Sequence, residues 1–221
     1  HRQFLLTCEA ALQSVDPRLE ALPYWDATLD IAAGGLAASI VWSPEWFGPF
    51  TGDPRDGYAV ALAGPLNATW RIARASASQP SNRHGFLRGR ASPLATSQLV
   101  RLPALASLPG VEASGRGCVS LPDFSSFHEC QDREHRCVHS VVAGTSKCVP
   151  RDIRAGHGWD VTAISGDYLD SAGSVNDPIF FVHHANLDRK FLAWQRAHAS
   201  LAPKYLYPDA APPGHGLAEI V

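Results

Sequence analysis

The sequence has 221 residues, of which 45% are hydrophobic, and its 19 basic and 21 acidic residues give a formal net charge of −2. This composition fits one globular domain over residues 1–221, and no apolar run approaches the length that crosses a bilayer. The basic residues form no dense cluster, which argues against a nucleic-acid-binding surface and favours small uncharged partners.

The first predicted element is an amphipathic helix over residues 1 to about 15, with His1 at its beginning and Asp16-Pro17 after its end. Its apolar residues recur at steps of three and four: Phe4, Leu5, Cys8, Ala11, Leu12 and Val15. The chain begins inside this pattern, without an initiating methionine or a signal peptide. We therefore expect an excerpt of a longer precursor, truncated at the N-terminus and also at the C-terminus.

Residues 27 to 117 are rich in Gly, Pro, Ser, Ala and Arg, which predicts a long loop-rich connection. A second helix is predicted from Asp123 to Val142 and a third from Pro178 to His198, with a turn-rich segment between them. A Pro-rich tail follows the third helix. Asn67 begins an Asn-Ala-Thr triplet, a glycosylation signal that also arises by chance.

Five cysteines predict disulfides, because four of them lie within about thirty residues: Cys118, Cys130, Cys137 and Cys148, with Cys8 far away. Metal binding by thiols is the alternative, although no CxxC pair occurs. On one helix, Cys130 and Cys137 stand about 10 Å apart along the axis, too far for a bridge. We therefore predict the pairs Cys118–Cys130 and Cys137–Cys148, and an oxidising, secretory compartment.

The second predicted helix carries His135 and His139 in the pattern EHRCVH. A spacing of four places both imidazoles on one helix face about one turn apart, where both can reach one metal ion. The alternative for such a pair is two half-exposed histidines on a helix surface.

The third predicted helix sets His183, His184 and Asp188 into an apolar segment, NDPIFFVHHANLDRKFLAWQ. Adjacent residues point about 100° apart, so one of the two histidines can face the same centre as the first pair, and the other must hydrogen-bond elsewhere. Asp188 can orient a ligand imidazole, and Arg189 can pair with a nearby acid; an ordinary solvated ion pair is the alternative for both. All-imidazole ligation suits copper, zinc, iron or nickel.

These segments together resemble the tyrosinase family of type 3 dicopper proteins. DPIFFVHHANLDRKFLAWQ is similar to the family's second copper motif, HRCVH to the histidine pair before it, and LPYWDA to the motif that follows the first copper site. The opening His1-Arg2, with Glu9 further along, resembles the helix that carries the last ligand of the first copper. The tail YPDAAPPGHG is similar to the segment after the second copper site in animal tyrosinases.

The resemblance implies two copper ions. His135, His139 and His184 match the ligands of the second copper, and His1 matches the last ligand of the first, whose other two ligands would precede residue 1. It also implies an all-α fold, a four-helix bundle with long irregular loops whose first helix would precede this chain. We expect His183 and Asp188 to act as outer partners of the ligands.

The resemblance further implies oxidation of phenols or catechols to quinones with dioxygen, in pigment or phenolic cross-linking chemistry. Glu129 is a candidate for holding a water that deprotonates phenols, with a plain surface residue as the alternative. Arg136 follows the first ligand where many tyrosinases have Asn, so we expect catechols to be favoured over monophenols and, if Arg136 lines the entrance, carboxylate-bearing substrates to be favoured too. An outward ion pair with Glu129 or Asp132 is the alternative for Arg136.

Two other functions use the same ligand set. A haemocyanin-like oxygen carrier differs in access to the copper pair, and a tyrosinase-related isomerase holds zinc. We expect no nucleic-acid partner, and any membrane anchor would lie outside this chain. Structural roles are expected for His84, His157, His198 and His215, whereas the sequence leaves the role of His128 open.

Overall fold

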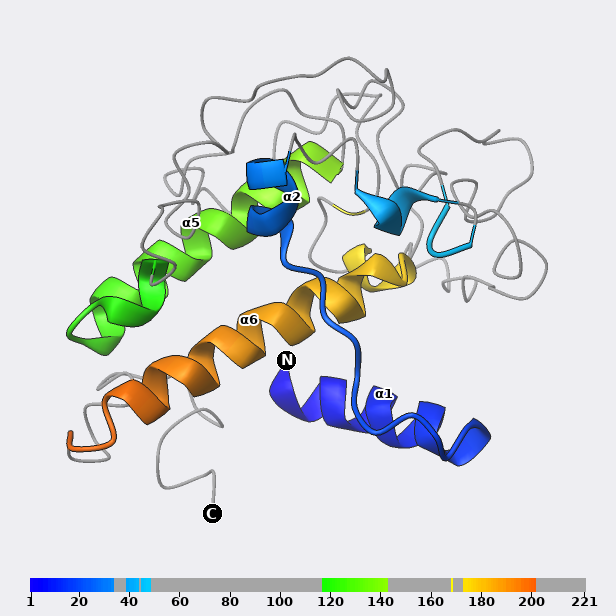
Figure 1. The fold of residues 1–221 in the computed structure, drawn as a ribbon, viewed down its shortest axis with the longest axis horizontal. Coiled ribbons are helices and arrows are strands. Elements are labelled where there is room, and N and C mark those ends of the chain that lie inside the picture. The colour runs from blue at the N-terminus through cyan, green and yellow to red at the C-terminus, as the bar shows by residue number, and fades with distance from the viewer. Residues whose placement is uncertain (34–38, 44, 49–116, 143–167, 169–172, 202–221) are drawn as a thin grey trace, which may run out of the picture.

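The computed structural model describes residues 1–33, 39–43, 45–48, 117–142, 168 and 173–201, and within these ranges every regular element is a helix. Three long helices dominate: α1 (Arg2–Val15), α5 (Phe124–Val142) and α6 (Ile179–Ala197). Figure 1 shows α5 and α6 running side by side in opposite directions, with the N-terminal end of α1 next to the middle of α6. The all-α prediction is confirmed for this part of the chain.

The ends of the long helices follow signals in the sequence, and all three predicted helices are confirmed to within a residue or two. Asp16 donates its backbone N–H to the Leu12 carbonyl at the end of α1, and Pro17 follows. At the start of α5, Asp123 Oδ1 accepts a hydrogen bond from the Ser126 N–H at 2.9 Å. At the start of α6, Asp177 Oδ1 accepts one from the Ile179 N–H at 3.1 Å. Both carboxylates satisfy backbone donors that a helix start leaves open.

The segment predicted as a loop-rich connection contains short helices. These are α2 (Ala27–Ala33), the 3-10 turn η2 (Ile40–Trp42) and, at its end, η5 (Gly117–Ser120); η7 (Ser174–Asn176) precedes α6. Asp26 starts α2, since its Oδ1 accepts from the Thr28 hydroxyl at 2.6 Å and from the Thr28 N–H at 3.2 Å. The loop prediction overlooked this Asp-x-Thr capping signal among the small residues. The rest of that segment, Asn67 and the Pro-rich tail lie outside the described ranges.

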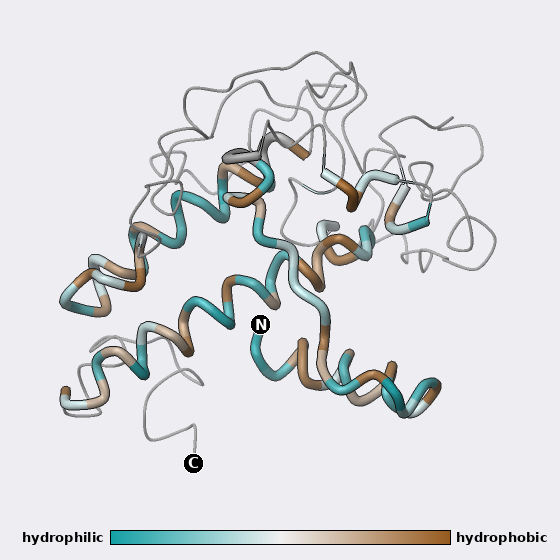
Figure 2. Tube along the Cα trace, viewed as in Figure 1, coloured by the Kyte–Doolittle hydropathy of each residue, from teal (hydrophilic) through white to brown (hydrophobic). Residues whose placement is uncertain are grey.

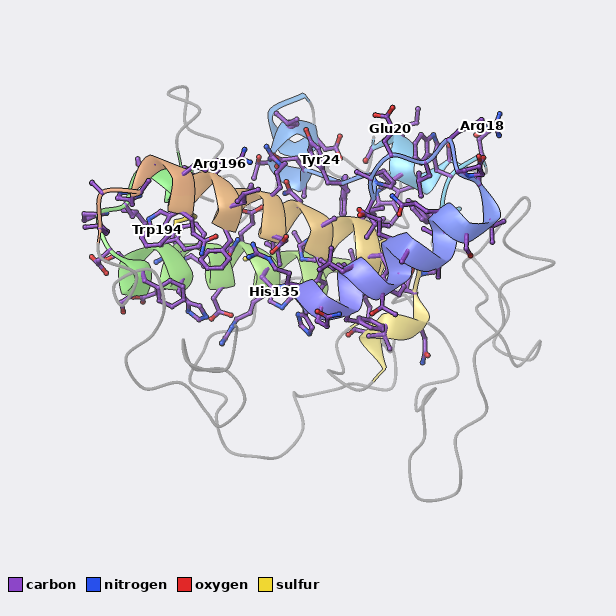
Figure 3. All side chains as sticks on the ribbon, turned by 90° about the horizontal axis from the view of Figure 1, so that it is seen from below. Arg18, Glu20, Tyr24, His135, Trp194 and Arg196 are labelled. Carbon is purple, nitrogen blue, oxygen red and sulfur yellow. A yellow bond between two sulfur atoms is a disulfide. The ribbon has the colours of Figure 1, made fainter. Side chains whose placement is uncertain are left out.

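An aromatic core joins the start of α5 to the end of α6. The rings of Phe127 and Trp194 stack with centroids 5.1 Å apart, and both side chains are buried. Trp194 Nε1 also donates to the Leu121 carbonyl at 2.8 Å. Figure 3 shows Trp194 between the two helices, and Figure 2 shows hydrophobic and hydrophilic residues alternating along them, as expected for amphipathic helices.

A disulfide closes this core. Cys118 of η5 is bonded to Cys130 of α5, with Cα atoms 5.6 Å apart, which confirms the first predicted pair. Cys137 is also disulfide-bonded. Its predicted partner, Cys148, lies outside the described ranges. Cys8 on α1 is a half-buried free thiol.

Along the helices with assigned positions, no stretch combines the length and the apolar character that crossing a lipid bilayer requires.

Candidate metal centre

Three histidines that the sequence predicts as ligands meet where α5 faces α6. His135 and His139 come from successive turns of α5 and His184 from α6, and one nitrogen from each lies within 4.8 Å of the others. The ring centroid of His135 lies 4.4 Å from that of His139 and 4.9 Å from that of His184. Figure 3 shows His135 beside the N-terminal end of α1. We call His135, His139 and His184 the histidine cluster.

The contacts of His139 orient its ring. Its Nδ1 lies 2.7 Å from the Tyr168 carbonyl oxygen, and since a carbonyl only accepts, Nδ1 carries the proton. The other nitrogen, Nε2, then presents a lone pair 3.4 Å from Nε2 of His184. The Tyr168 ring stacks on His139 at 4.3 Å, and the Phe180 ring stacks on His184 at 4.0 Å. These flanking rings limit rotation of both imidazoles.

His183, the other member of the adjacent pair, lies behind the cluster. Its Nε2 is 3.2 Å from Nδ1 of His135, and the two rings are parallel. If His135 Nδ1 donates this hydrogen bond, His135 Nε2 is left with a lone pair, as in His139. The side chain of His183 is only 1% exposed, so its hydrogen bond is held away from water. The prediction that one histidine of the pair hydrogen-bonds elsewhere therefore has a definite partner, a member of the cluster itself.

Burial keeps the cluster neutral. Loss of hydration lowers the pKa of His139 to about 4, although its hydrogen bond to Tyr168 acts in the opposite direction. Burial, then the nearby His135 and His139, lowers the pKa of His184 to about 2. Burial is also the main cause of a pKa well below the usual value for His135. Near neutral pH these nitrogens keep their lone pairs, so the donor set fits a cation that takes imidazole ligands, such as copper or zinc.

The lowered pKa values make the stability of the metal-free chain depend on pH. In the unfolded chain histidine binds a proton below about pH 6.5. Folded, His139 does so only near pH 4. Between these values the unfolded state binds more protons, so the free energy of unfolding falls on acidification by about 1.4 kcal/mol per pH unit for each such histidine.

Urea unfolding of the metal-free chain at pH 7, 6 and 5 measures this slope. His139→Gln should reduce it, whereas His128→Gln, at an exposed position of the same helix, should leave it unchanged. If the free energy of unfolding rose as the pH was lowered from about 6.5 to about 4, the conclusion that the cluster histidines are neutral would be wrong.

His1 lies at the edge of the cluster, with its ring centroid 4.4 Å from that of His184. The next residue, Arg2, donates from Nε to Asp188 Oδ1 at 2.6 Å. Asp188 was expected to orient a ligand imidazole. The contact found is a partly exposed ion pair with Arg2, which is the alternative given for Asp188, because α1 brings a cation to this point of α6. The Arg2–Asp188 pair thus links the start of α1, next to His1, to α6.

The two candidates for substrate chemistry, Glu129 and Arg136, are not among the residues that line the cavity beside the cluster. A cavity of about 470 Å³ borders the cluster, and its lining includes His135, His184 and Asp132. Glu129 is exposed and is not among the lining residues, which favours the surface alternative. Arg136 pairs with Asp132 at 2.8 Å, one turn back on α5, as its own alternative predicted. This pairing offsets the charge of Arg136, so the expected preference for carboxylate-bearing substrates loses its support.

Sequence reasoning missed a group of buried charges beside the cluster. Glu134, 1% exposed, accepts hydrogen bonds from Lys190 Nζ at 2.7 and 2.9 Å. Asp26 accepts from Arg189 at 2.8 Å, which gives the predicted acid partner of Arg189. Helical spacing could have shown that both side chains face the core, because Glu134 lies seven residues after Phe127 and Lys190 four before Trp194, but not that the two pair.

His198, at the end of α6, has the structural role expected of it. Its ring stacks on Trp194 at 4.8 Å, and its Nδ1 contacts the Trp194 carbonyl. His128 is exposed. The other three histidines given structural roles lie outside the described ranges.

Three neutral imidazoles converge from two antiparallel helices and could together hold one metal ion. Residues 1–197 match the family model described as the common central domain of tyrosinase, so the chain belongs to the tyrosinase family.

Curated relatives agree with this assignment. The chain is 32% identical over 205 residues to a tyrosinase of Streptomyces antibioticus, covering 90% of this chain and 62% of the relative. It is 30% identical over 228 residues to grixazone synthase of Streptomyces griseus, covering 93% and 66%. A tyrosinase of Streptomyces lincolnensis is 30% identical over 220 residues, covering 96% and 66%. The chain thus spans somewhat less than two thirds of the length of these relatives.

Proposed function

We propose that the protein is a dicopper oxidase that converts catechols, and more slowly phenols, to o-quinones with dioxygen. The observation that carries the proposal is the cluster of the half-buried His135 with the buried His139 and His184, of which one nitrogen each lies within 4.8 Å of the others, in a chain of the tyrosinase family. The products of such an oxidation are reactive quinones, which suit pigment formation or phenolic cross-linking.

The residues would divide between two copper ions. His135, His139 and His184 would hold one, with His183 and the Tyr168 carbonyl as outer hydrogen-bond partners. His1, whose ring contacts that of His184, would contribute one ligand to a second copper ion. When bound, a copper pair supplies reversible one-electron chemistry that lets dioxygen take two electrons from a catechol.

Metal content and activity together test this function. Purified with its metals, the native protein should contain two copper ions and oxidise catechols. The 221-residue chain by itself should bind one copper ion tightly, because three cluster imidazoles are gathered and His1 alone cannot fix a second. Copper without catechol turnover would favour the oxygen carrier, zinc in the native protein would favour the isomerase, and two equally tight coppers in the 221-residue chain would refute the assignment of His1.

Arg136 gives a prediction about substrates. A guanidinium has donors but no acceptor, so it cannot replace an amide oxygen in positioning a water that takes the proton of a phenol. Catechols are more acidic and depend less on that step. Arg136→Asn should therefore raise the ratio of monophenol to catechol turnover by at least about tenfold, a fraction of what a placed general base contributes.

The measurement compares matched monophenols and catechols in the native protein and the variant. Arg18→Asn is the control, since it removes an exposed arginine that also pairs with an aspartate. An unchanged ratio in Arg136→Asn would show that Arg136 does not control substrate choice.

We also propose an oxidising, secretory compartment. The Cys118–Cys130 disulfide supports it, because such bonds persist where thiols are not kept reduced. The sequon at Asn67 gives a direct test, since a secreted form should lose mass on enzymatic deglycosylation and an Asn67→Gln form should not.

A further inference from the structure

A buried ion pair joins α5 to α6 beside the histidine cluster. Lys190 Nζ lies 2.7 Å from one carboxylate oxygen of Glu134 and 2.9 Å from the other. The two side chains are 12% and 1% exposed. Glu134 immediately precedes His135, so its backbone and that of a cluster residue move as one. Among the described residues, this is the ion pair that crosses between α5 and α6.

The charges around the pair balance. Asp26 Oδ1 lies 3.5 Å from Lys190 Nζ, and Asp26 Oδ2 is paired with Arg189 at 2.8 Å. Two carboxylates, of Asp26 and Glu134, thus lie beside two cations, of Arg189 and Lys190. Both Glu134 and Lys190 therefore have a group of opposite charge within reach. Asp26 stands at the start of α2, so the segment between α1 and α2 is fixed to the same point of α6.

The alignment of α5 along α6, which we call their register, brings together both the ion pair and the histidine cluster. His139 meets His184 near one end of the interface, and Gln131 donates to the Leu187 carbonyl at 2.6 Å further along. Stacked aromatic rings such as Phe127 and Trp194 tolerate small sliding movements, because dispersion is weakly directional. Two short charge-assisted hydrogen bonds tolerate such sliding poorly, because they depend on distance and direction. A slide of α5 along α6 by one helical turn, about 5.4 Å, would separate the two ions completely.

Stability alone does not account for such a pair. A buried ion pair can often be replaced by apolar residues of similar volume without loss of stability, since removing both ions from water offsets their attraction. Its best-attested use is to fix the register of packed helices. At this position, fixing the register also fixes how the nitrogens of α5 face the nitrogen of α6.

We propose that Glu134 and Lys190 are positioning residues, which set the register of α5 on α6 and thereby the geometry of the histidine cluster for copper. The inference rests on the proposed function, in that it takes copper as the ligand of the cluster. It assigns to the pair a contribution to metal affinity that is separate from its contribution to folding.

The test separates folding from metal geometry. Glu134→Leu with Lys190→Leu replaces the pair by two apolar side chains, Glu134→Gln keeps the shape and one hydrogen bond, and Lys190→Arg keeps the charge. Arg18→Met is the control, because it breaks a surface ion pair of α1. For each full chain, urea unfolding gives stability, competition with a chelator gives the affinity for copper(II), and electron paramagnetic resonance gives the copper(II) hyperfine coupling.

The double leucine variant should unfold at nearly the wild-type urea concentration while binding copper(II) at least about tenfold more weakly, as is typical for loss of an outer partner, with an altered hyperfine coupling. Lys190→Arg should bind within about threefold of wild type, and the control should match wild type. Wild-type affinity and hyperfine coupling in the double variant would overturn the inference. If the double variant does not fold, the affinity for copper(II) and the hyperfine coupling of Glu134→Gln test the inference in its place. A wild-type chain that takes no copper would instead refute the proposed function.

Discussion

Replacing His184 with alanine is expected to abolish tight copper binding by the cluster and to lower catechol oxidation at least about 100-fold, beyond the usual effect of losing an outer hydrogen-bond partner. His184 is the contribution of α6 to the cluster, so the two histidines of α5 would remain with no ligand opposite them. The lost ring also leaves Phe180 without its stacking partner.

Copper content after dialysis and the rate of quinone formation measure the two effects. His198→Ala is the matched control, because this histidine belongs to the same α6 region but contacts Trp194 rather than the cluster. The control should keep its copper. If His184→Ala binds copper as tightly as wild type, His184 is not a ligand and the centre has been misassigned.

Removing the Cys118–Cys130 disulfide should lower the free energy of unfolding by about 3 kcal/mol, the value expected from chain entropy for a loop of this size. The bridge joins residues 12 apart and lies in a core cluster with Phe127 and Trp194. The variant to measure is Cys118→Ala with Cys130→Ala, in urea unfolding under non-reducing conditions.

The free thiol provides the control for this measurement. Cys8→Ala changes a half-buried cysteine that closes no loop, so it should cost no more than about 1 kcal/mol. A double variant within about 0.5 kcal/mol of wild type would show that the aromatic packing holds η5 on α5 without the covalent bond.

Regular spacing made much of the fold predictable. Residues three and four apart share a helix face, so α1, α5 and α6 could be assigned from their apolar residues. The same rule placed His135 and His139 on one face, and the 100° between neighbours separated the roles of His183 and His184. The i,i+4 ion pair of Arg136 with Asp132 was also foreseen as an alternative, because it is local.

Contacts between distant segments were not predictable in this way. Asp188 was assigned to a nearby imidazole, but its partner, Arg2, is 186 residues away. The Glu134–Lys190 pair spans 56 residues, and no periodicity indicates which charge meets which across two helices. The short helix α2 was missed because Gly and Pro further along the segment dominated its composition.

Because α6 is attached to several other segments, its docking determines when the histidine cluster is complete. Arg2 of α1, the backbone N–H of Trp25 and the ion pair with Glu134 all attach to this one helix, which begins at Ile179. Contacts between residues so far apart are formed late, since the chain between them must first be closed into a loop. During synthesis His135 and His139 leave the ribosome 45 or more residues before His184. The nascent chain therefore presents at most two of these three nitrogens until α6 docks on α5, so the three-histidine cluster is complete only when the helices around it are in place.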